Sequence, residues 1–309
     1  MTRLNGAVER SERLAGVLAI LTASGLWGAS GGVVSGIAVN GVAAAAVVEL
    51  VTGLTLLVVA RATGASLRAG ISVMSWSLLG LAVLEAGNAS LYYLALHMAP
   101  LGVVIALHLT SPLMLALVEL IRGSRTPTLR DLVSVISVAA AIIVIGTAEG
   151  GGNGPNILLG LFLSLTSAAC LAVFITMVRR LSSQTSSAMG SGLQTMCSGL
   201  LLAPGLLLLD GHAAALPPLA LTALVLFAPA SWFYWRSLRS LESIPAATIQ
   251  LSEPIFGAGA ALILFGTVPS LWDAVAVALI LVAAWLELTR PIDHENDLAF
   301  AEELPILPT

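Results

Sequence analysis

The sequence predicts an all-α integral membrane protein with ten transmembrane helices, arranged as two inverted repeats of five helices. Three observations lead to this prediction. First, 58% of the 309 residues are hydrophobic and only 10% are charged, and the mean hydropathy of +0.99 lies outside the range of soluble chains. Second, the arginines occur in alternate loops. Third, a pattern in the first half of the chain returns in the second half with the opposite orientation.

Ten segments are long and apolar enough to cross a bilayer, given a helical rise of about 1.5 Å per residue. The connections between them are short, so we expect consecutive helices to be neighbours with no soluble domain inserted. Any function is therefore expected inside the membrane. The predicted spans are Leu14–Val39, Val42–Ala60, Val73–Leu96, Pro100–Ile121, Leu129–Thr147, Asn156–Val178, Ala188–Leu209, Pro217–Trp235, Ile244–Gly266 and Ser270–Thr289.

The arginines predict the orientation of the chain. The sequence has no lysine, and all 13 arginines lie in the two tails or in alternate loops. The intervening loops, such as Gly150–Pro155 and Asp210–Leu216, contain none. Short basic loops stay in the cytoplasm. We therefore expect a multi-pass protein of the cell membrane with both termini in the cytoplasm and an even number of spans.

A short repeat relates the two halves of the chain. Shifting the sequence by 142 residues places Tyr92 on Tyr234, and HLTSPL at His108–Leu113 on QLSEPI at Gln250–Ile255. The first copy lies in a span that enters from outside, and the second lies in a span that enters from inside. Inverted repeats require this relation, because an axis in the membrane plane relates their two units.

The repeat and the composition divide the chain into three parts. We expect a first five-helix unit at 1–149, a second, inverted unit at 150–290, and a cytosolic tail at 291–309. The tail carries five acids, one histidine and no arginine, so its composition predicts disorder.

Two prolines, Pro112 and Pro254, occupy equivalent positions in the two copies of the repeat. A proline inside a helix has no N–H for the carbonyl four residues back, so the carbonyls of His108 and Gln250 are expected to lack their helical partners. Such a carbonyl is tolerated where it faces protein or a wet cavity. Both faces are thus expected to point inward, either to hold a ligand or to bond a neighbouring helix at a kink.

Acids inside the spans are the first candidates for function. A lipid-facing acid at mid-bilayer costs about 3 kcal/mol, so such residues turn inward, pair or line water. Glu49, Glu85 and Glu253 lie deep in their spans, whereas Glu119 lies one turn from a basic end and is expected to pair with Arg122 or Arg125. No arginine lies deep enough to neutralise the other three. Protons are therefore candidate coupling ions.

Other polar residues indicate where these acids meet. Asn88 and Tyr92 follow Glu85 at i+3 and i+7 and share its helix face. Gln250 shares a face with Glu253, for which the alternative is a protonated acid bonded to a neighbouring helix. The repeat pairs Gln250 with His108 and Glu253 with Ser111, both of which lie in span four. The candidate solute-binding residues are Glu253, Gln250, His108, Ser111, Glu85, Asn88, Tyr92, Glu49 and Trp27.

The aromatic residues are typical of a membrane protein. Trp27 and Tyr92 are deep enough to stack on a substrate, although packing in the core is the simpler explanation. Interfacial belts are expected to contain Trp76, Trp232, Phe233 and Trp235 on the cytoplasmic side and Trp272 on the outer side.

Several kinds of site find no support. Cys170 and Cys197 lie in apolar runs as small hydrophobes, so no disulfide, metal site or cofactor is predicted. GASG at Gly28–Gly31 matches the G-x-S-G of rhomboid-type intramembrane serine proteases, with His108 as an imaginable base. A tight helix face of small residues explains this motif without chemistry. We therefore predict no catalytic residue and no enzyme activity.

Three motifs carry a resemblance to a known family. LWGAS at Leu26–Ser30, APLGVVIALHLTSPL at Ala99–Leu113 and IPAATIQLSEPIFGAGAALILFG at Ile244–Gly266 together resemble the EamA-type drug/metabolite transporters. The span-four motif is most similar to the threonine/homoserine exporter branch. The resemblance implies a secondary exporter of amino acids or related small amphiphilic metabolites, with a cavity formed mainly by spans one to four and six to nine.

The chain departs from the family pattern at three places. The family commonly has an arginine where Glu49 stands and often an acid where Thr267 stands, and the exporter branch tends to have an acid where His108 stands. These changes bear on the substrate more than on the fold.

Two other classes of function stay open on the sequence. One is a membrane sensor or assembly subunit without transport, and the other is an intramembrane serine hydrolase. As partners we expect a small-molecule solute, the lipid bilayer and protons, but no nucleic acid; a homodimer is one assembly that we consider.

Overall fold

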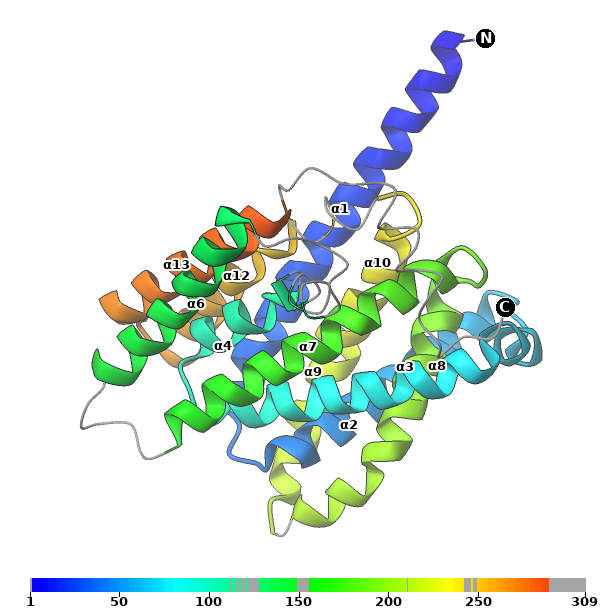
Figure 1. The fold of residues 1–309 in the computed structure, drawn as a ribbon. Coiled ribbons are helices and arrows are strands. Elements are labelled where there is room, and N and C mark those ends of the chain that lie inside the picture. Colours follow the sequence, from blue (N-terminus) through cyan, green and yellow to red (C-terminus); the bar gives the residue numbers. More distant parts are fainter. Residues whose placement is uncertain are drawn as a thin grey trace.

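Helices form the whole regular structure of the described chain. The computed structural model describes residues 2–111, 113–114, 117, 121, 128–148, 156–209, 211–241, 246 and 249–288. Within these ranges every regular element is helical (Figure 1), which confirms the predicted all-α class. The elements are α1 (Thr2–Ser35), α2 (Gly41–Ala62), α3 (Leu67–Leu96), α4 (Leu101–His108), α6 (Leu129–Ala148), α7 (Ile157–Ser182), α8 (Ser187–Leu202), η1 (Ala203–Leu209), η2 (Ala213–Ala215), α9 (Leu216–Thr222), η3 (Ala223–Phe227), α10 (Ala228–Ser237), α12 (Glu253–Phe265) and α13 (Leu271–Leu288).

Six helical segments of the described chain are long and apolar enough to cross a membrane. They are Glu12–Ser35, Gly41–Ala62, Trp76–Leu96, Ile157–Ser182, Ser187–Leu209 and Ala213–Ser237. Glu253–Phe265 and Leu271–Ala283 are shorter apolar helices. The chain is therefore a multi-pass membrane protein, while the count of ten spans stays a prediction. Pro112, Glu119, Arg122, Arg125 and the tail 291–309 lie outside the described residues.

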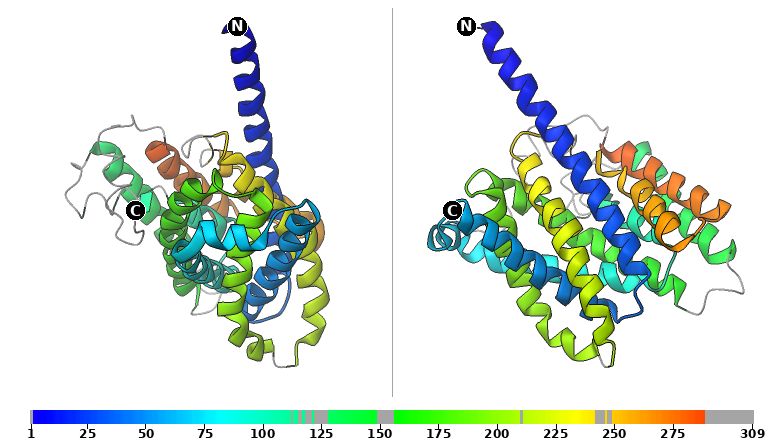
Figure 2. Two further views of the ribbon diagram at one scale, coloured as in Figure 1. Left: turned by 90° about the vertical axis from the view of Figure 1, so that its right-hand side faces the viewer. Right: turned by 180° about the vertical axis from the view of Figure 1, so that it is seen from behind.

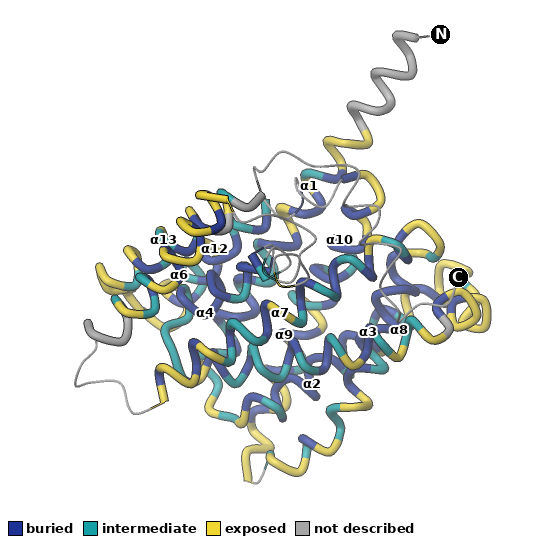
Figure 3. The backbone as a smooth tube through the Cα atoms, in the orientation of Figure 1, coloured by how far each residue is buried: buried dark blue, intermediate teal, exposed yellow. Residues whose placement is uncertain are grey.

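The outer surface of the helices is apolar, as a lipid environment requires. Figure 3 shows that exposed residues follow the outward faces of the helices and that buried residues face the interior of the bundle. The exposed residues include large apolar side chains such as Trp76, which is 72% exposed, and Ile263, which is 83% exposed. In water such a surface would drive aggregation, whereas in lipid it is the expected one.

Side-chain caps and prolines set several helix boundaries. The side chains of Asn40, Ser66 and Ser186 accept hydrogen bonds from the first turns of α2, α3 and α8. Between α9 and α10 the helix continues through a π-turn, in which the N–H of Ala228 donates to the carbonyl five residues back. Pro229 explains this wide turn, because it has no N–H for the carbonyl four residues before it.

The helices of spans four and nine are both interrupted. After α4 the chain makes a turn at Leu109–Thr110, and before α12 it makes a turn at Leu251–Ser252. The two turns are 142 residues apart, which is the shift of the sequence repeat. In each turn a hydroxyl donates back to a carbonyl: Thr110 to Leu107 O at 2.6 Å, and Ser252 to Ile249 O at 2.7 Å. These bonds compete with the helical pattern and so help to end it.

The helices pack in pairs that join the two halves of the chain. The pairs are α2 with α8, α4 with α12, α6 with α13, α3 with α7, and α1 with α10 and α12. Figure 2 shows α1 between α10 and α12, and the pair α6 and α13 at one edge of the bundle. The resemblance implied a cavity formed mainly by spans one to four and six to nine, and the edge position of α6 and α13, which belong to spans five and ten, agrees with it (Figure 2).

Contacts between distant segments place several arginine-bearing ends at one end of the bundle. A Cβ atom on Gly16 would lie 2.5 Å from Ser240 Oγ, and one on Gly70 would lie 2.6 Å from the Met189 side chain. Arg239 Nε donates to the carbonyl of Ser182 at 2.8 Å. The Gly16 turn of α1, the α2–α3 and α7–α8 connections and the end of α10 therefore lie together, while the first turns of α1 extend beyond the bundle (Figure 1). Which side of the membrane this end faces stays a prediction.

Glycines bring α1 and α12 into direct backbone contact. A Cβ atom on Gly28 would lie 2.5 Å from the carbonyl oxygen of Glu253 and 2.8 Å from the nitrogen of Gly257. Neither neighbour is a flexible side-chain end that can move aside. GASG thus lies at a close helix crossing, which is the structural explanation that the sequence offered for this motif.

This crossing predicts that Gly28→Ala destabilises the protein. The added methyl would force the two backbones apart, at a cost of about 1–3 kcal/mol. Gly259→Ala in α12 is the matched control, because nothing lies within 4 Å of its Cβ position. Thermal unfolding in detergent should show a lower Tm for Gly28→Ala than for Gly259→Ala. Equal values would mean that the crossing is loose.

Candidate functional site

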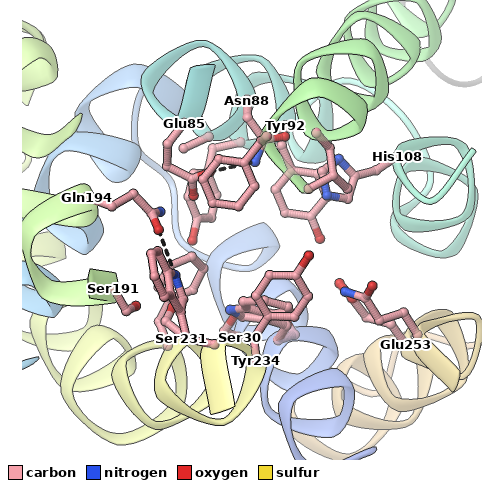
Figure 4. Close-up of a pocket in the computed structure, with 18 residues that line it drawn as sticks. Ser30, Glu85, Asn88, Tyr92, His108, Ser191, Gln194, Ser231, Tyr234 and Glu253 are labelled. Atoms are coloured by element: carbon pink, nitrogen blue, oxygen red, sulfur yellow. Dashed lines mark hydrogen bonds between the residues drawn. The ribbon is translucent and has the colours of Figure 1, made fainter. Parts of the chain in front are cut away.

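A polar pocket lies inside the bundle, between helices of both halves of the chain. Its walls come from α1, α3 and α4 of the first half, from α7, α8 and α10 of the second half, and from the segment around the start of α12 (Figure 4). It offers about 60 Å³ to the centres of water-sized molecules. A single water needs about 10–15 Å³ by this measure, so several waters or a small solute can enter.

The structure brings together most of the residues that the sequence singled out. Seven of the nine candidates line the pocket: Trp27, Glu85, Asn88, Tyr92, His108, Gln250 and Glu253. Ser111 and Glu49 are buried but are not among the lining residues. That the seven bind a solute stays a prediction.

Other lining residues were missed by sequence reasoning. They are Ser30, Ala89, Tyr93, Leu171, Phe174, Ser191, Gln194, Phe227, Ser231, Tyr234 and Trp235. The repeat contained a signal for Tyr234, because it is the counterpart of Tyr92. Trp235 was expected in an interfacial belt, and this was wrong. It is 1% exposed, and its Nε1–H donates to Gln194 Oε1 at 2.9 Å. Its position next to Arg236 indicated the membrane interface, but it carried no signal that the side chain points into the bundle.

A chain of hydrogen bonds connects three walls of the pocket. Asn88 Nδ2 donates to Glu85 Oε2 at 3.3 Å within α3. Ser167 of α7 donates to Asn88 Oδ1 at 2.9 Å, and His108 Nδ1 of α4 lies 2.9 Å from Ser167 Oγ. Since the only proton of Ser167 goes to Asn88, the hydroxyl accepts from His108 Nδ1–H, and His108 Nε2 is left as an acceptor. This chain fixes the orientation of all four side chains.

The same bonds bear on the protease-like motif. The Ser30 hydroxyl donates to the carbonyl of Trp27 at 2.8 Å within its own helix. His108 Nδ1 bonds to Ser167 instead. Ser30 and His108 thus each have another bond, so these two side chains do not form the serine–histidine dyad that the motif suggested.

The two acids of the pocket stand apart from each other. In Figure 4, Glu85 and Glu253 lie at opposite ends of the pocket. Glu253 lies within electrostatic range of the hydroxyls of Tyr92, Tyr93 and Tyr234. The lining contains no arginine and no lysine among the described residues, so the acids dominate its charge.

Aromatic rings form much of the remaining wall. The ring centroids of Trp27 and Tyr234 are 5.0 Å apart, and those of Tyr92 and His108 are 4.7 Å apart. Several polar atoms of the lining are buried without a hydrogen-bond partner in the protein: Trp27 Nε1, the hydroxyls of Tyr92, Tyr93 and Tyr234, and Ser191 Oγ. Buried polar groups are normally bonded. These atoms are therefore suited to bond a solute or water in the pocket.

Comparison with known proteins gives one family. Residues 158–289 match the EamA-like transporter family. This region runs from α7 to the end of α13 and supplies the pocket walls of the second half. EamA-like proteins are transporters, and this match supports a membrane transporter rather than an enzyme.

The chain can also be compared with curated proteins and with solved structures. No curated protein matches the chain. A solved structure titled "Crystal structure of protein" is 19% identical, with a TM-score of 0.57, and the match covers 90% of this chain and 96% of that one. At this identity the likeness shows the fold alone, and it extends over both halves of the chain.

The hydrogen-bond chain predicts a specific effect of Ser167→Ala. Removing the hydroxyl leaves His108 Nδ1–H and Asn88 Oδ1 without their partner, which costs about 1–3 kcal/mol when such groups are buried. The Tm in detergent should fall. Thr166→Ala is the control, because its exposed hydroxyl donates to the Phe162 carbonyl of its own helix. A smaller loss for Ser167→Ala than for Thr166→Ala would contradict the network.

Proposed function

We propose that the protein is a secondary active transporter that exports amino acids or related small amphiphilic metabolites by alternating access. The observation that carries the proposal is the polar, acid-bearing pocket enclosed by helices of both halves. The EamA-like match of residues 158–289 supports it. On the span-four motif at Ala99–Leu113, we place the chain nearest to the threonine/homoserine exporter branch.

Two inverted five-helix units are part of this proposal, with boundaries at 1–149 and 150–290. The helix pairing supports them: α2 packs on α8, α4 on α12 and α6 on α13, and each pair joins equivalent helices of the two units. The contact of α3 with α7 has its counterpart in the contact of α10 with α1. A half-turn about an axis in the membrane plane produces this pattern. The equivalent turns at Leu109–Thr110 and Leu251–Ser252 support the same relation.

The chemistry of the pocket favours a solute that carries an ammonium group. Glu253 and Glu85 offer negative charge, and the aromatic rings offer faces that attract cations. An amino acid also carries a carboxylate. Trp27 Nε1–H and the tyrosine hydroxyls have no partner in the protein and can donate to it. An amino acid with an apolar side chain would bind the acids through its ammonium group, the unpartnered donors through its carboxylate and the aromatic rings through its side chain.

The position of Glu253 suits a group that changes its charge during transport. It is the first residue of α12, where the positive end of the helix dipole stabilises a carboxylate. Pro254 follows it and opens the helix at this point. We propose that Glu253 binds a proton and the solute ammonium group in turn while the two units rock about the pocket. Exchange of one cation for the other couples export to proton entry.

The membrane side of each terminus follows from the arginines. We propose that the arginine-bearing end of the bundle faces the cytoplasm of a cell membrane, which places both termini there. A homodimer is compatible with this arrangement and is not required by it.

Glu253→Gln should abolish proton-driven transport. The amide keeps the size of the side chain but cannot exchange a proton. The measurement is pH-gradient-driven uptake of a panel of radiolabelled amino acids and amines into inside-out vesicles, with membrane insertion checked by immunoblot. Glu12→Gln in the exposed part of α1 is the control and should leave uptake unchanged.

Two outcomes would count against the proposal. Unchanged uptake in Glu253→Gln would defeat the role of this residue. A complete lack of flux for the wild-type protein, with no effect of Gln250→Ala or Glu253→Ala on any cellular phenotype, would favour a sensor or assembly subunit.

A further inference from the structure

Glu49 in α2 is a buried acid that the proposed transport cycle does not use. It is 0% exposed, and neither oxygen of its carboxyl group has a hydrogen-bond partner. The hydroxyls of Thr52, Tyr93 and Ser198 are also buried without a partner. Buried polar groups are nearly always bonded, so this group of residues on three helices requires an explanation.

These four side chains belong to one site between α2, α3 and α8. Thr52 lies one turn after Glu49 on the same face of α2. The Ser198 hydroxyl of α8 lies beside the Glu49 carboxyl group. Tyr93 of α3 lines the pocket and is also within electrostatic range of both Glu49 and Glu85, so it stands between the pocket and Glu49. Glu85 lines the pocket, so the site lies directly behind the pocket wall.

Close packing of α2 on α8 closes this site on the side away from the pocket. A Cβ atom on Gly53 would lie 2.4 Å from the nitrogen of Met196, and one on Gly199 would lie 2.7 Å from the nitrogen of Leu50. The backbones of α2 and α8 therefore touch beside Glu49, at Leu50, and again one turn further along α2, at Gly53. Glu49 does not line the pocket, so a solute in the pocket does not reach it.

The charges around Glu49 do not neutralise a carboxylate. Glu85 is the charged group of the described residues that acts on it, and it carries the same sign. The other titratable groups on the helices packed against α2 are Arg68, Tyr92 and Tyr93 on α3, Cys197 on α8, and Tyr234 and Arg236 on α10. The two arginines lie in the first turn of α3 and the last turn of α10, and neither acts on Glu49. An isolated carboxylate in such a place is very unfavourable. A proton or a bound cation must therefore neutralise Glu49.

We propose that Glu49 is a proton site separate from the solute pocket, and that Glu85 exchanges this proton with water in the pocket. A proton needs no space of its own, whereas a metal cation needs a cavity and several oxygen ligands at fixed distances. No group of three or more His, Cys, Asp or Glu side chains suited to a metal exists in the described residues. The closed packing thus favours the proton.

The unbonded hydroxyls fit a site that is emptied and refilled. When Glu49 holds the proton, its O–H can donate to Ser198 or Thr52. When the proton passes to the Glu85 carboxylate, Glu49 becomes negative and both hydroxyls can rotate to donate to it. Two neighbouring carboxylates resist being charged together, so one proton stays on the pair until pocket water removes it. The coupling role of this pair rests on the proposed transport function, but the proton on Glu49 does not.

Infrared spectroscopy of the detergent-purified protein tests this site without any solute. A protonated carboxyl group gives a C=O stretching band that a carboxylate lacks, and the band shifts in D₂O. We expect a pH titration of the wild-type protein to show such a band that is lost in Glu49→Gln. Ser198→Ala should shift the band, because it removes a bonding partner of the acid. Glu12→Gln is the control and should change nothing.

Each outcome decides for or against the proton site. A protonated-carboxyl band of the same size in the wild type and in Glu49→Gln at every pH would show that Glu49 carries no proton and would overturn it. Loss of the wild-type band when sodium chloride replaces potassium chloride would indicate a cation site and would also overturn it. If Glu49→Gln does not fold, Ser198→Ala and Thr52→Val replace it as the test. A shifted carboxyl band in these variants supports the proton site, and an unshifted band overturns it. A band at Glu49 in a protein without flux would reject transport while keeping the proton site.

Discussion

The structure depends on one constraint: acids are buried in a membrane-spanning bundle whose described residues place no arginine or lysine beside them. Lipid cannot solvate a carboxylate, so Glu49, Glu85 and Glu253 have to face the interior of the bundle. The helices that carry them then have fixed rotations about their axes. The pocket, its hydrogen-bond chain and the apolar outer surface all follow from these rotations.

The interrupted helices of spans four and nine place irregular backbone inside the membrane, and its polar groups must also avoid lipid. Thr110 and Ser252 bond back to the carbonyls of their own helices, and the turns they stabilise lie beside the pocket. In lipid, irregular backbone is tolerated only where protein or a wet cavity surrounds it. The turns and the pocket therefore require each other. The backbone contact at Gly28 then holds α12, and with it Glu253, against α1.

Sequence reasoning found the helical class and both acids of the lining, but it could not find several of the uncharged lining residues. An acid in lipid must turn inward, so Glu85 and Glu253 were predictable, and the repeat pointed to Tyr234. Ser191 and Gln194 of α8 were missed, because small or uncharged polar residues are common in membrane helices and carry no strong signal. For Glu49 the inward direction was predictable, but not its separation from the pocket. That separation depends on the close contact of α2 with α8, which only the three-dimensional packing reveals.

The central claim is that this acid-lined pocket binds a solute with an ammonium group. A thermal-shift screen of the detergent-purified protein tests it most directly, since a bound ligand raises the apparent Tm by mass action. The screen compares amino acids and amines with nucleosides and with organic acids that lack an amine. The account predicts a higher Tm with amino acids or amines only. Stabilisation by the organic acids alone would contradict it.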